Sequence, residues 1–276
     1  MTADLDPKEI TELVRELLES GSRGVLTTLI DSGALDLHVG AKLVVYESGE
    51  RHGSLGKDAL AEAVSRQAAG FLQTRDEARI FPVADFAPEL TEFAGVKILF
   101  ERIEAEPRLI IAGAGHVGAS LARLAAMIGY RVTLIDDRAE FVDRKSFATP
   151  GDEAIDLIWA RDWQAALRQA IGNGRGVSVA IVTRGHKQDE ECLRAAVETN
   201  PDYVGMIGSK RRTNIVLDKL REEGANEVQL RKVRAPIGLD IGAVSPEEVA
   251  LAILAEIVAE RRGGAGAPLS KWRRMD

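Results

Sequence analysis

The chain has 276 residues, 45% of them hydrophobic and 29% charged, which is typical of a globular protein of one or two domains. Its formal net charge of −7 disfavours a nucleic-acid partner, because a phosphate backbone calls for a basic surface. The single cysteine, Cys192, excludes an internal disulfide and any multi-cysteine metal site, and the sequence predicts no bound metal.

The sequence carries no signal for a membrane. No apolar run approaches the roughly 20 residues that cross a bilayer, so we expect no stable membrane insertion. The N-terminus, MTADLDPKEI, is acidic and lacks the apolar core of a signal peptide. These features predict a cytoplasmic protein.

The N-terminal part predicts a small α+β domain. Asp6, Pro7 and Glu9 form the pattern of a capping box, and the helix that follows ends at Gly21. The residues typical of strands lie at 24–30, 41–46 and 96–100, and a second helix is expected over 58–72. The polar stretch 101–107 ends in proline, so we place the boundary there, between domains 1–104 and 105–276.

Residues 108–137 predict one βαβ unit of the dinucleotide-binding kind. The run 109–112 is apolar, as in a strand buried on both faces, and GAGHVG then fills the pattern G-x-G-x-x-G. In this pattern the first glycine makes a tight turn, the second lets a pyrophosphate approach the backbone, and the third lets the helix pack close to the strand. The candidate cofactor-binding residues here are Gly113, Gly115, His116, Val117 and Gly118. The alternative is a tight turn that binds no ligand.

The next strand, 131–136, ends in two carboxylates. Asp136 lies about 20 residues after the glycines, where an acid receives a ribose hydroxyl. Asp136 and the adjacent Asp137 are therefore candidate cofactor-binding residues. They favour an NAD-type dinucleotide over its 2′-phosphorylated form, because a carboxylate repels the phosphate.

Strands and helices continue to alternate after residue 137, which predicts an α/β fold: a Rossmann-like parallel-sheet domain preceded by the smaller α+β domain. The expected strands are 154–158, 177–183 and 203–207. The expected helices are 162–171, one from about 189, one that follows 208–212 and ends at about 223, and 246–262. Ligands of such sheets bind at the carboxyl ends of the strands, so the loops there are the places for a site.

Two of these loops carry polar side chains. Thr183 and His186 follow one strand, and His186 could form an acid/base pair with Asp189, although a helix N-cap is the favoured role for that aspartate. His116 sits at a helix N-terminus, whose dipole favours the neutral imidazole. No catalytic residue is assigned.

Residues 208–212 form the next loop and predict an anion site. Ser209, Lys210, Arg211 and Arg212 stand at a helix start, where cations oppose the helix dipole unless an anion binds. The alternative is a solvated cationic face. The segment 234–242 is expected to fold over the mouth of the sheet, with Asp240 either capping a turn or contacting the ligand.

Five motifs in order carry a family resemblance. GAGHVG, IDDR, TRGHKQDE, YVGMIGSKRR and RAPIGLDIGAVSPEEVALAILAEI, spanning 108–262, resemble the XdhC/CoxI family of xanthine dehydrogenase accessory factors. The resemblance implies a protein that carries the molybdenum cofactor. It also implies that the protein works with a cysteine desulfurase or sulfurase and hands the cofactor to an apo molybdenum hydroxylase. Such a protein acts more as a chaperone than as a catalyst.

The N-terminal domain departs from the family pattern. Members show G-S-S-P-R-x-x-G-A-K where residues 33–42 read GALDLHVGAK, and G-S-x-x-G-G-C-x-E where this chain has Ala59 at the cysteine position. A thiolate could ligate molybdenum or relay sulfur, and alanine can do neither. The sequence leaves three functions open: the cofactor chaperone, which is favoured, an NAD-dependent oxidoreductase acting on a small substrate, and a nucleotide sensor without catalysis. It also leaves a homodimer open.

Overall fold

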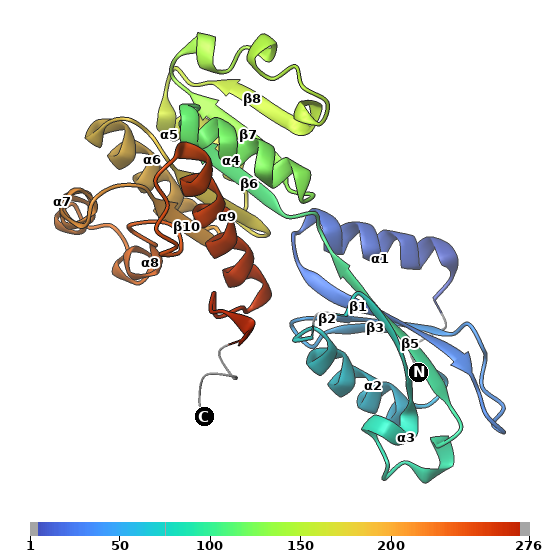
Figure 1. Ribbon diagram of the computed structural model, residues 1–276. Helices are drawn as coiled ribbons and strands as arrows, with labels where there is room; N and C mark the ends of the chain where they lie inside the picture. The colour runs from blue at the N-terminus through green and yellow to red at the C-terminus, as the bar shows by residue number, and fades with distance from the viewer. Residues whose placement is uncertain (1–4, 75, 271–276) are drawn as a thin grey trace. The chain divides into compact units, whose positions relative to one another are not determined.

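The computed structural model describes residues 5–74 and 76–270. The chain divides into two compact units, Met1–Ala105 and Glu106–Asp276, one residue beyond the division expected from the polar linker (Figure 1). In the described ranges, no helix combines the length and apolar character needed to span a bilayer.

The first unit is an antiparallel sheet with helices. Its strands are β1 (Arg23–Asp31), β2 (Lys42–Tyr46), β3 (Arg51–Gly53), β4 (Ala78–Pro82) and β5 (Lys97–Glu104), and its helices are α1 (Pro7–Glu19), α2 (Asp58–Phe71) and α3 (Val83–Phe86). The strand order is β3-β2-β1-β5-β4, and each neighbouring pair is antiparallel. This is the α+β domain that the sequence predicts.

The two long helices of this unit lie on opposite faces of its sheet. Val25 of β1 belongs to the apolar core that α2 helps to build. The adjacent Gly24 faces the other way, because successive residues of a strand point to opposite faces. A Cβ atom on Gly24 would lie 2.5 Å from the Leu17 side chain of α1. Asp6 caps α1 through the predicted capping box, which is confirmed.

Of the strands and helices named above, three are not predicted from the sequence, because their residue patterns are too short or too irregular. β3 is three residues long. β4 is an edge strand whose first three residues are exposed, so the alternation of apolar and polar residues is lost. α3 is a single turn of four residues.

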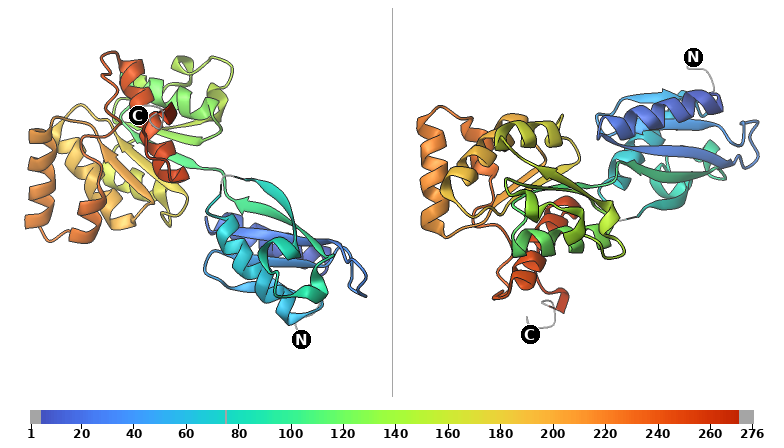
Figure 2. Two further views of the ribbon diagram at one scale, coloured as in Figure 1. Left: turned by 60° about the horizontal axis from the view of Figure 1, so that its bottom comes forward. Right: turned by 90° about the horizontal axis from the view of Figure 1, so that it is seen from above.

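The second unit is a doubly wound α/β fold (Figures 1 and 2). Its strands are β6 (Arg108–Ala112), β7 (Arg131–Asp136), β8 (Ile155–Trp159), β9 (Val177–Ile181) and β10 (Tyr203–Met206). Its helices are α4 (His116–Met127), α5 (Trp163–Ile171), α6 (His186–Thr199), α7 (Lys210–Glu222), α8 (Glu227–Lys232) and α9 (Pro246–Arg262). The order β10-β9-β6-β7-β8 is parallel throughout and confirms the Rossmann-like prediction.

Both faces of this sheet are covered. Side chains of α5, α6, α7 and α8 pack on one face against Ile110 and Val179. Side chains of α4 and α9 pack on the other face against Ile111 and Leu134. The strand order reverses its direction at β6, so the switch point, where such folds bind ligands, lies between β6 and β9.

The segment 234–242 runs along the edge of the sheet rather than over its mouth. Arg234 forms a parallel bridge with Gly205 of β10, and the Ile237 side chain is buried in the α9-side core. The segment is held at the edge because the Glu256 carboxylate of α9 accepts the Gly238 N–H and the Tyr203 hydroxyl. Asp240 is exposed and has no hydrogen-bond partner among residues 5–74 and 76–270, so it does not cap a turn, and a ligand contact stays a prediction.

Candidate functional site

The glycine turn after β6 is built as tightly as the motif requires. The N–H of Gly113 donates to the carbonyl of Ile135 in β7, and the N–H of Val182 donates to the carbonyl of Ala112. Gly113 has a φ of +113°, and a Cβ atom there would lie 2.6 Å from the Val182 carbonyl oxygen. Only glycine meets both conditions without strain.

The other two glycines of the motif differ sharply in their surroundings. A Cβ atom on Gly118 would lie 1.8 Å from the Gly113 carbonyl oxygen, so this glycine lets α4 pack against the turn. A Cβ atom on Gly115 would meet no heavy atom within 4 Å, and φ at Gly115 is −66°. Gly115 is therefore not required by the fold. The open space above it, at the N-terminus of α4, is where a pyrophosphate could approach the backbone.

Asp136 at the end of β7 is buried, with an exposed fraction of 1%, and its carboxylate is fully occupied. It accepts hydrogen bonds from the N–H of Ala114 at 2.7 Å and from Arg138 through the backbone N–H, Nε and Nη2. Burial raises the pKa of this carboxyl, but the bonds from Arg138 and Ala114 outweigh burial and hold the pKa below its ordinary value. Asp136 thus ties the glycine turn to Arg138, and a ribose hydroxyl would have to displace one of these donors.

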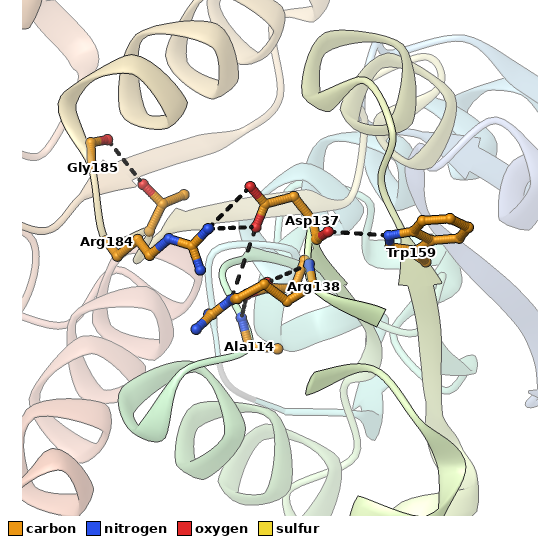
Figure 3. Close-up of polar contacts among 8 residues, drawn as sticks. Ala114, Asp137, Arg138, Trp159, Arg184 and Gly185 are labelled. Atoms are coloured by element: carbon orange, nitrogen blue, oxygen red, sulfur yellow. Dashed lines mark hydrogen bonds and ion pairs between the residues drawn. The ribbon is translucent and has the colours of Figure 1, made fainter. Parts of the chain in front are cut away.

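The Asp137 side chain, after β7, lies across the glycine turn from the loop that follows β9. Its carboxylate lies 3.4 Å from the Arg184 guanidinium in the loop after β9, while its carbonyl accepts the indole N–H of Trp159 at 3.1 Å (Figure 3). β6 lies between β7 and β9 in the sheet, so this ion pair joins the two strands that flank the glycine turn. Both side chains are partly exposed, so a ligand can compete for either of them.

The loop after β9 is held by a buried carboxylate, and the predicted cap role of that carboxylate is wrong. The N-cap of α6 is Gly185, and Asp189 lies one turn inside the helix with no exposed surface. Its Oδ1 accepts the Thr183 hydroxyl at 2.5 Å, and its Oδ2 accepts both Nε and Nη2 of Arg212 in α7. Burial raises the pKa of the Asp189 carboxyl above its ordinary value, in opposition to these two partners. Thr183 and Arg212 therefore position two loops relative to each other.

The start of α7 carries two exposed cations. Ser209 is the N-cap, and its hydroxyl accepts the N–H of Arg212 at 3.3 Å. Lys210 and Arg211 are exposed, and neither forms an ion pair within the part of the chain that the structure describes. The predicted anion site thus reduces to Lys210, Arg211 and the helix N-terminus, because Arg212 is already paired.

The two histidines of the candidate site are exposed at helix N-termini. His116 is the first residue of α4 and His186 the first of α6. Neither imidazole makes a hydrogen bond to another described residue, so no acid/base pair with a carboxylate is assembled here. Val117 packs its side chain against the α9-side core, which leaves only its backbone N–H for a ligand.

Three further residues lie at this edge that are not among the predicted cofactor-binding residues: Arg138, Arg184 and Trp159. Each follows or ends a parallel strand, which is the one signal that could have identified them. Their roles depend on partners on other strands, which a linear pattern does not reveal.

The residues suit a phosphate better than a metal. No group of three or more His, Cys, Asp or Glu side chains that could hold a metal ion occurs in residues 5–74 and 76–270. Cys192 is buried in α6, and burial raises the pKa of its thiol well above the ordinary value, which disfavours the thiolate that ligates metals or attacks as a nucleophile. Ala59 lies exposed in the first turn of α2.

Family models match both units. Residues 109–257, more than half of the chain, match the XdhC Rossmann domain, and residues 17–81 match the XdhC and CoxI family. The first match contains every candidate residue of the carboxyl edge described above.

Individual relatives agree with this assignment. The chain is 27% identical over 261 residues to the uncharacterized protein YqeB of Escherichia coli strain K12, covering 93% of this chain and 47% of YqeB. It is 31% identical over 166 residues to a probable xanthine dehydrogenase subunit of Bacillus subtilis strain 168, covering 60% of this chain and 46% of the relative. It is 34% identical over 84 residues to the molybdenum cofactor insertion chaperone PaoD of Escherichia coli strain K12, covering 30% of this chain and 26% of PaoD. The chain thus spans about half the length, or less, of these relatives. It belongs to the XdhC and CoxI family, and its second unit is an XdhC Rossmann domain.

Proposed function

We propose that this protein assists the maturation of a molybdenum hydroxylase of the xanthine dehydrogenase type. In this proposal it binds the molybdenum cofactor, or a related dinucleotide, at the carboxyl edge of its Rossmann unit and delivers it to the apo-enzyme. Membership of the XdhC and CoxI family supports this role, as does the similarity to a cofactor insertion chaperone.

The observation that carries the binding step is the open space at Gly115. The glycine turn leaves backbone N–H groups accessible at the start of α4, and Lys210 and Arg211 add unpaired positive charge at the same edge. A pyrophosphate fits this arrangement, because helix N-termini and nearby cations both stabilise an anion. Gly115, His116 and Val117 would hold the pyrophosphate on a turn shaped by Gly113 and Gly118, and His186 would lie toward the pterin end.

The same residues argue against chemistry on the cofactor by this chain itself. Its single cysteine is buried with a raised pKa, and alanine occupies the family cysteine position. Sulfuration would therefore belong to a partner cysteine desulfurase or sulfurase, with this protein presenting the cofactor. No described histidine at the edge is hydrogen-bonded to a carboxylate, so proton transfer of the kind a dehydrogenase needs has no assembled pair.

Cofactor binding is tested by separating free from bound molybdenum. The purified protein is mixed with molybdenum cofactor released from a mature hydroxylase, passed over a sizing column and analysed for metal. We expect wild-type protein to retain molybdenum and Gly115→Val to lose it, because a branched side chain would occupy the open space, in which a Cβ atom meets no heavy atom within 4 Å. Light scattering on the same fractions shows whether a homodimer carries the cofactor.

Transfer is tested by adding the loaded protein to apo-hydroxylase. The expected result is more hydroxylase activity than the same amount of free cofactor gives, with no oxidation of NADH by the protein alone. Robust NADH turnover without activation would instead favour the oxidoreductase function. Tight nucleotide binding with neither activity would favour the sensor.

A further inference from the structure

The Asp137 carboxylate lies between two guanidinium groups beside the glycine turn (Figure 3). Its Oδ1 lies 3.4 Å from Nη2 of Arg184 and 3.9 Å from Nε of Arg138. Arg138 also donates to both carboxylate oxygens of Asp136, at 2.8 and 2.9 Å. These side chains are two carboxylates and two guanidiniums, so together they present no net positive charge to an anionic ligand.

The Arg184 side chain starts beside the space proposed for a pyrophosphate. Arg184 lies two residues after Val182, whose N–H donates to the Ala112 carbonyl just before the glycine turn. The same backbone contacts the turn closely, because a Cβ atom on Gly113 would lie 2.6 Å from the Val182 carbonyl oxygen and 3.0 Å from the Thr183 nitrogen. Arg184 is therefore attached at the end of β9, where this strand adjoins β6 at the switch point of the sheet.

The ion pair between Asp137 and Arg184 is weaker than the pair beneath it. Its separation of 3.4 Å exceeds the roughly 2.7–2.9 Å of a strong charge-assisted hydrogen bond. The exposed fraction is 52% for the Arg184 side chain and 29% for the Asp137 side chain. Exposed ion pairs contribute little to stability, because water screens them and both side chains lose freedom. A ligand can therefore take Arg184 from Asp137 at a small cost.

The backbone beside both partners is anchored, so only a side chain has to move. The Asp137 carbonyl accepts the indole N–H of Trp159 at 3.1 Å. Thr183, just before Arg184, donates its hydroxyl to the buried Asp189 carboxylate at 2.5 Å. Rotation of the Arg184 side chain is thus enough to bring its guanidinium from Asp137 to a ligand.

We propose that Arg184 is a phosphate-binding residue of this edge and that Asp137 is its internal competitor. The Asp137 carboxylate holds the guanidinium until a phosphate group replaces it. The inference rests on the proposed pyrophosphate site at Gly115. Arginine fits such a ligand, because its planar fork donates two parallel hydrogen bonds to phosphate oxygens. The competitor lowers the apparent affinity, because only molecules with a free guanidinium are ready to bind.

The test measures the binding of inorganic pyrophosphate by calorimetry in the wild type, Asp137→Asn, Arg184→Gln and the double variant. We expect Asp137→Asn to bind about three- to tenfold more tightly and Arg184→Gln about three- to tenfold more weakly, as is typical of exposed charges. The two changes should therefore act in opposite directions. Asp137→Asn keeps the backbone carbonyl that accepts the Trp159 indole, and thermal unfolding of each variant checks that the fold is kept.

The double variant separates competition for Arg184 from simple repulsion of the ligand. If Asp137 acts by holding Arg184, the gain from Asp137→Asn should shrink to less than about twofold in the Arg184→Gln background, which a double-mutant cycle measures. If Asp137 only repels the anion, the gain should be the same or larger there, because no Arg184 guanidinium then neutralises the carboxylate. That second result would overturn the role of Asp137 as a competitor.

Glu198→Gln is the matched control for the change in charge. Glu198 forms an exposed ion pair with Arg168 at 2.6 Å, so its replacement also frees an arginine and removes one negative charge. Glu198 lies near the C-terminus of α6, whereas the N-terminus of α6 lies at the carboxyl edge. Pyrophosphate affinity should therefore stay within about twofold of the wild type, since salt screens a distant charge. A gain as large as that of Asp137→Asn would assign both effects to net charge and overturn the inference.

The outcomes also distinguish this inference from the proposed function. Pyrophosphate binding that is lost in Gly115→Val, but is equal or weaker in Asp137→Asn than in the wild type, would overturn the competitor and leave the pyrophosphate site intact. Pyrophosphate binding that Gly115→Val leaves unchanged, or that no variant shows, would remove the pyrophosphate site and this inference with it.

Discussion

Two layers of charge at the carboxyl edge of the Rossmann unit behave differently. The lower layer consists of the pairs Asp136–Arg138 and Asp189–Arg212, in which both carboxylates are buried. The upper layer consists of Asp137, Arg184, Lys210 and Arg211, which are partly or fully exposed. The lower layer fixes the backbone of the loops, whereas the upper layer is accessible to a ligand. Changes in the first should therefore cost stability, and changes in the second should alter affinity.

The glycine motif contains the same contrast and gives the largest expected effect. Gly118→Ala should lower the free energy of unfolding by about 3 kcal/mol or more, because the new Cβ meets backbone that cannot move aside. Gly115→Ala is the matched control in the same motif, and it should leave the free energy of unfolding within about 0.5 kcal/mol of the wild type. Urea unfolding of both variants measures the difference, and similar losses would show that Gly115 also supports the fold.

Breaking a buried pair is the next largest effect. Arg212→Gln leaves the Asp189 carboxylate buried without its cation, which we expect to cost about 3 kcal/mol of stability. Arg211→Gln, one residue earlier on the exposed side of the same helix, is the control and should change stability little. If the unfolding curves of the two variants coincide, then Arg212 does not stabilise the fold.

Acid should weaken the lower layer through Asp136. Its pKa is below the ordinary value in the folded protein, so its contribution to stability is present above about pH 4, the pKa in the unfolded chain, and is lost as the pH falls through the folded pKa. Asp136→Asn should therefore be less stable than the wild type at pH 7, and the gap should shrink below about pH 4. Unfolding measured from about pH 7 down to about pH 2.5 checks this, and parallel curves would contradict it.

Affinity rather than stability should respond to the upper layer. The double variant Lys210→Gln, Arg211→Gln should bind inorganic pyrophosphate about three- to tenfold more weakly, as expected for exposed charges. The loss should fade as salt is raised from about 0.02 to about 0.5 M, since screening already acts over roughly 10 Å at about 0.1 M. Calorimetry at several salt concentrations tests this. A loss that does not depend on salt would indicate a structural effect instead.

The sequence predicts the lower layer's backbone but not its charge pairs. Apolar strands, the helix cap at Asp6 and the glycine turn are local patterns, and each is found where expected. Asp136 and Arg138 are only two positions apart, but the other ion pairs at this edge join residues far apart in sequence. Arg212 and Asp189 are 23 positions apart, and Arg184 and Asp137, of the upper layer, are 47 apart. Whether such groups meet depends on the order of the strands. For this reason the sequence wrongly predicts a helix cap at Asp189 and does not reveal that Arg212 is paired.

The smallest expected effect concerns a 2′-phosphate on the ligand. The sequence predicts that Asp136 favours NAD over NADP, but in the structure both oxygens of Asp136 are neutralised by Arg138. A paired carboxylate repels a phosphate weakly, and the adjacent guanidinium attracts it, so we expect the two ligands to differ by less than about fivefold. Arg138→Ala should expose the carboxylate and shift the ratio toward NAD. The ratio is the useful readout, because any other effect of removing Arg138 should weaken both ligands alike. Calorimetry with both ligands, in the wild type and in Arg138→Ala, decides the matter. A strong preference for NAD in the wild type would mean that Arg138 moves aside when the ribose binds.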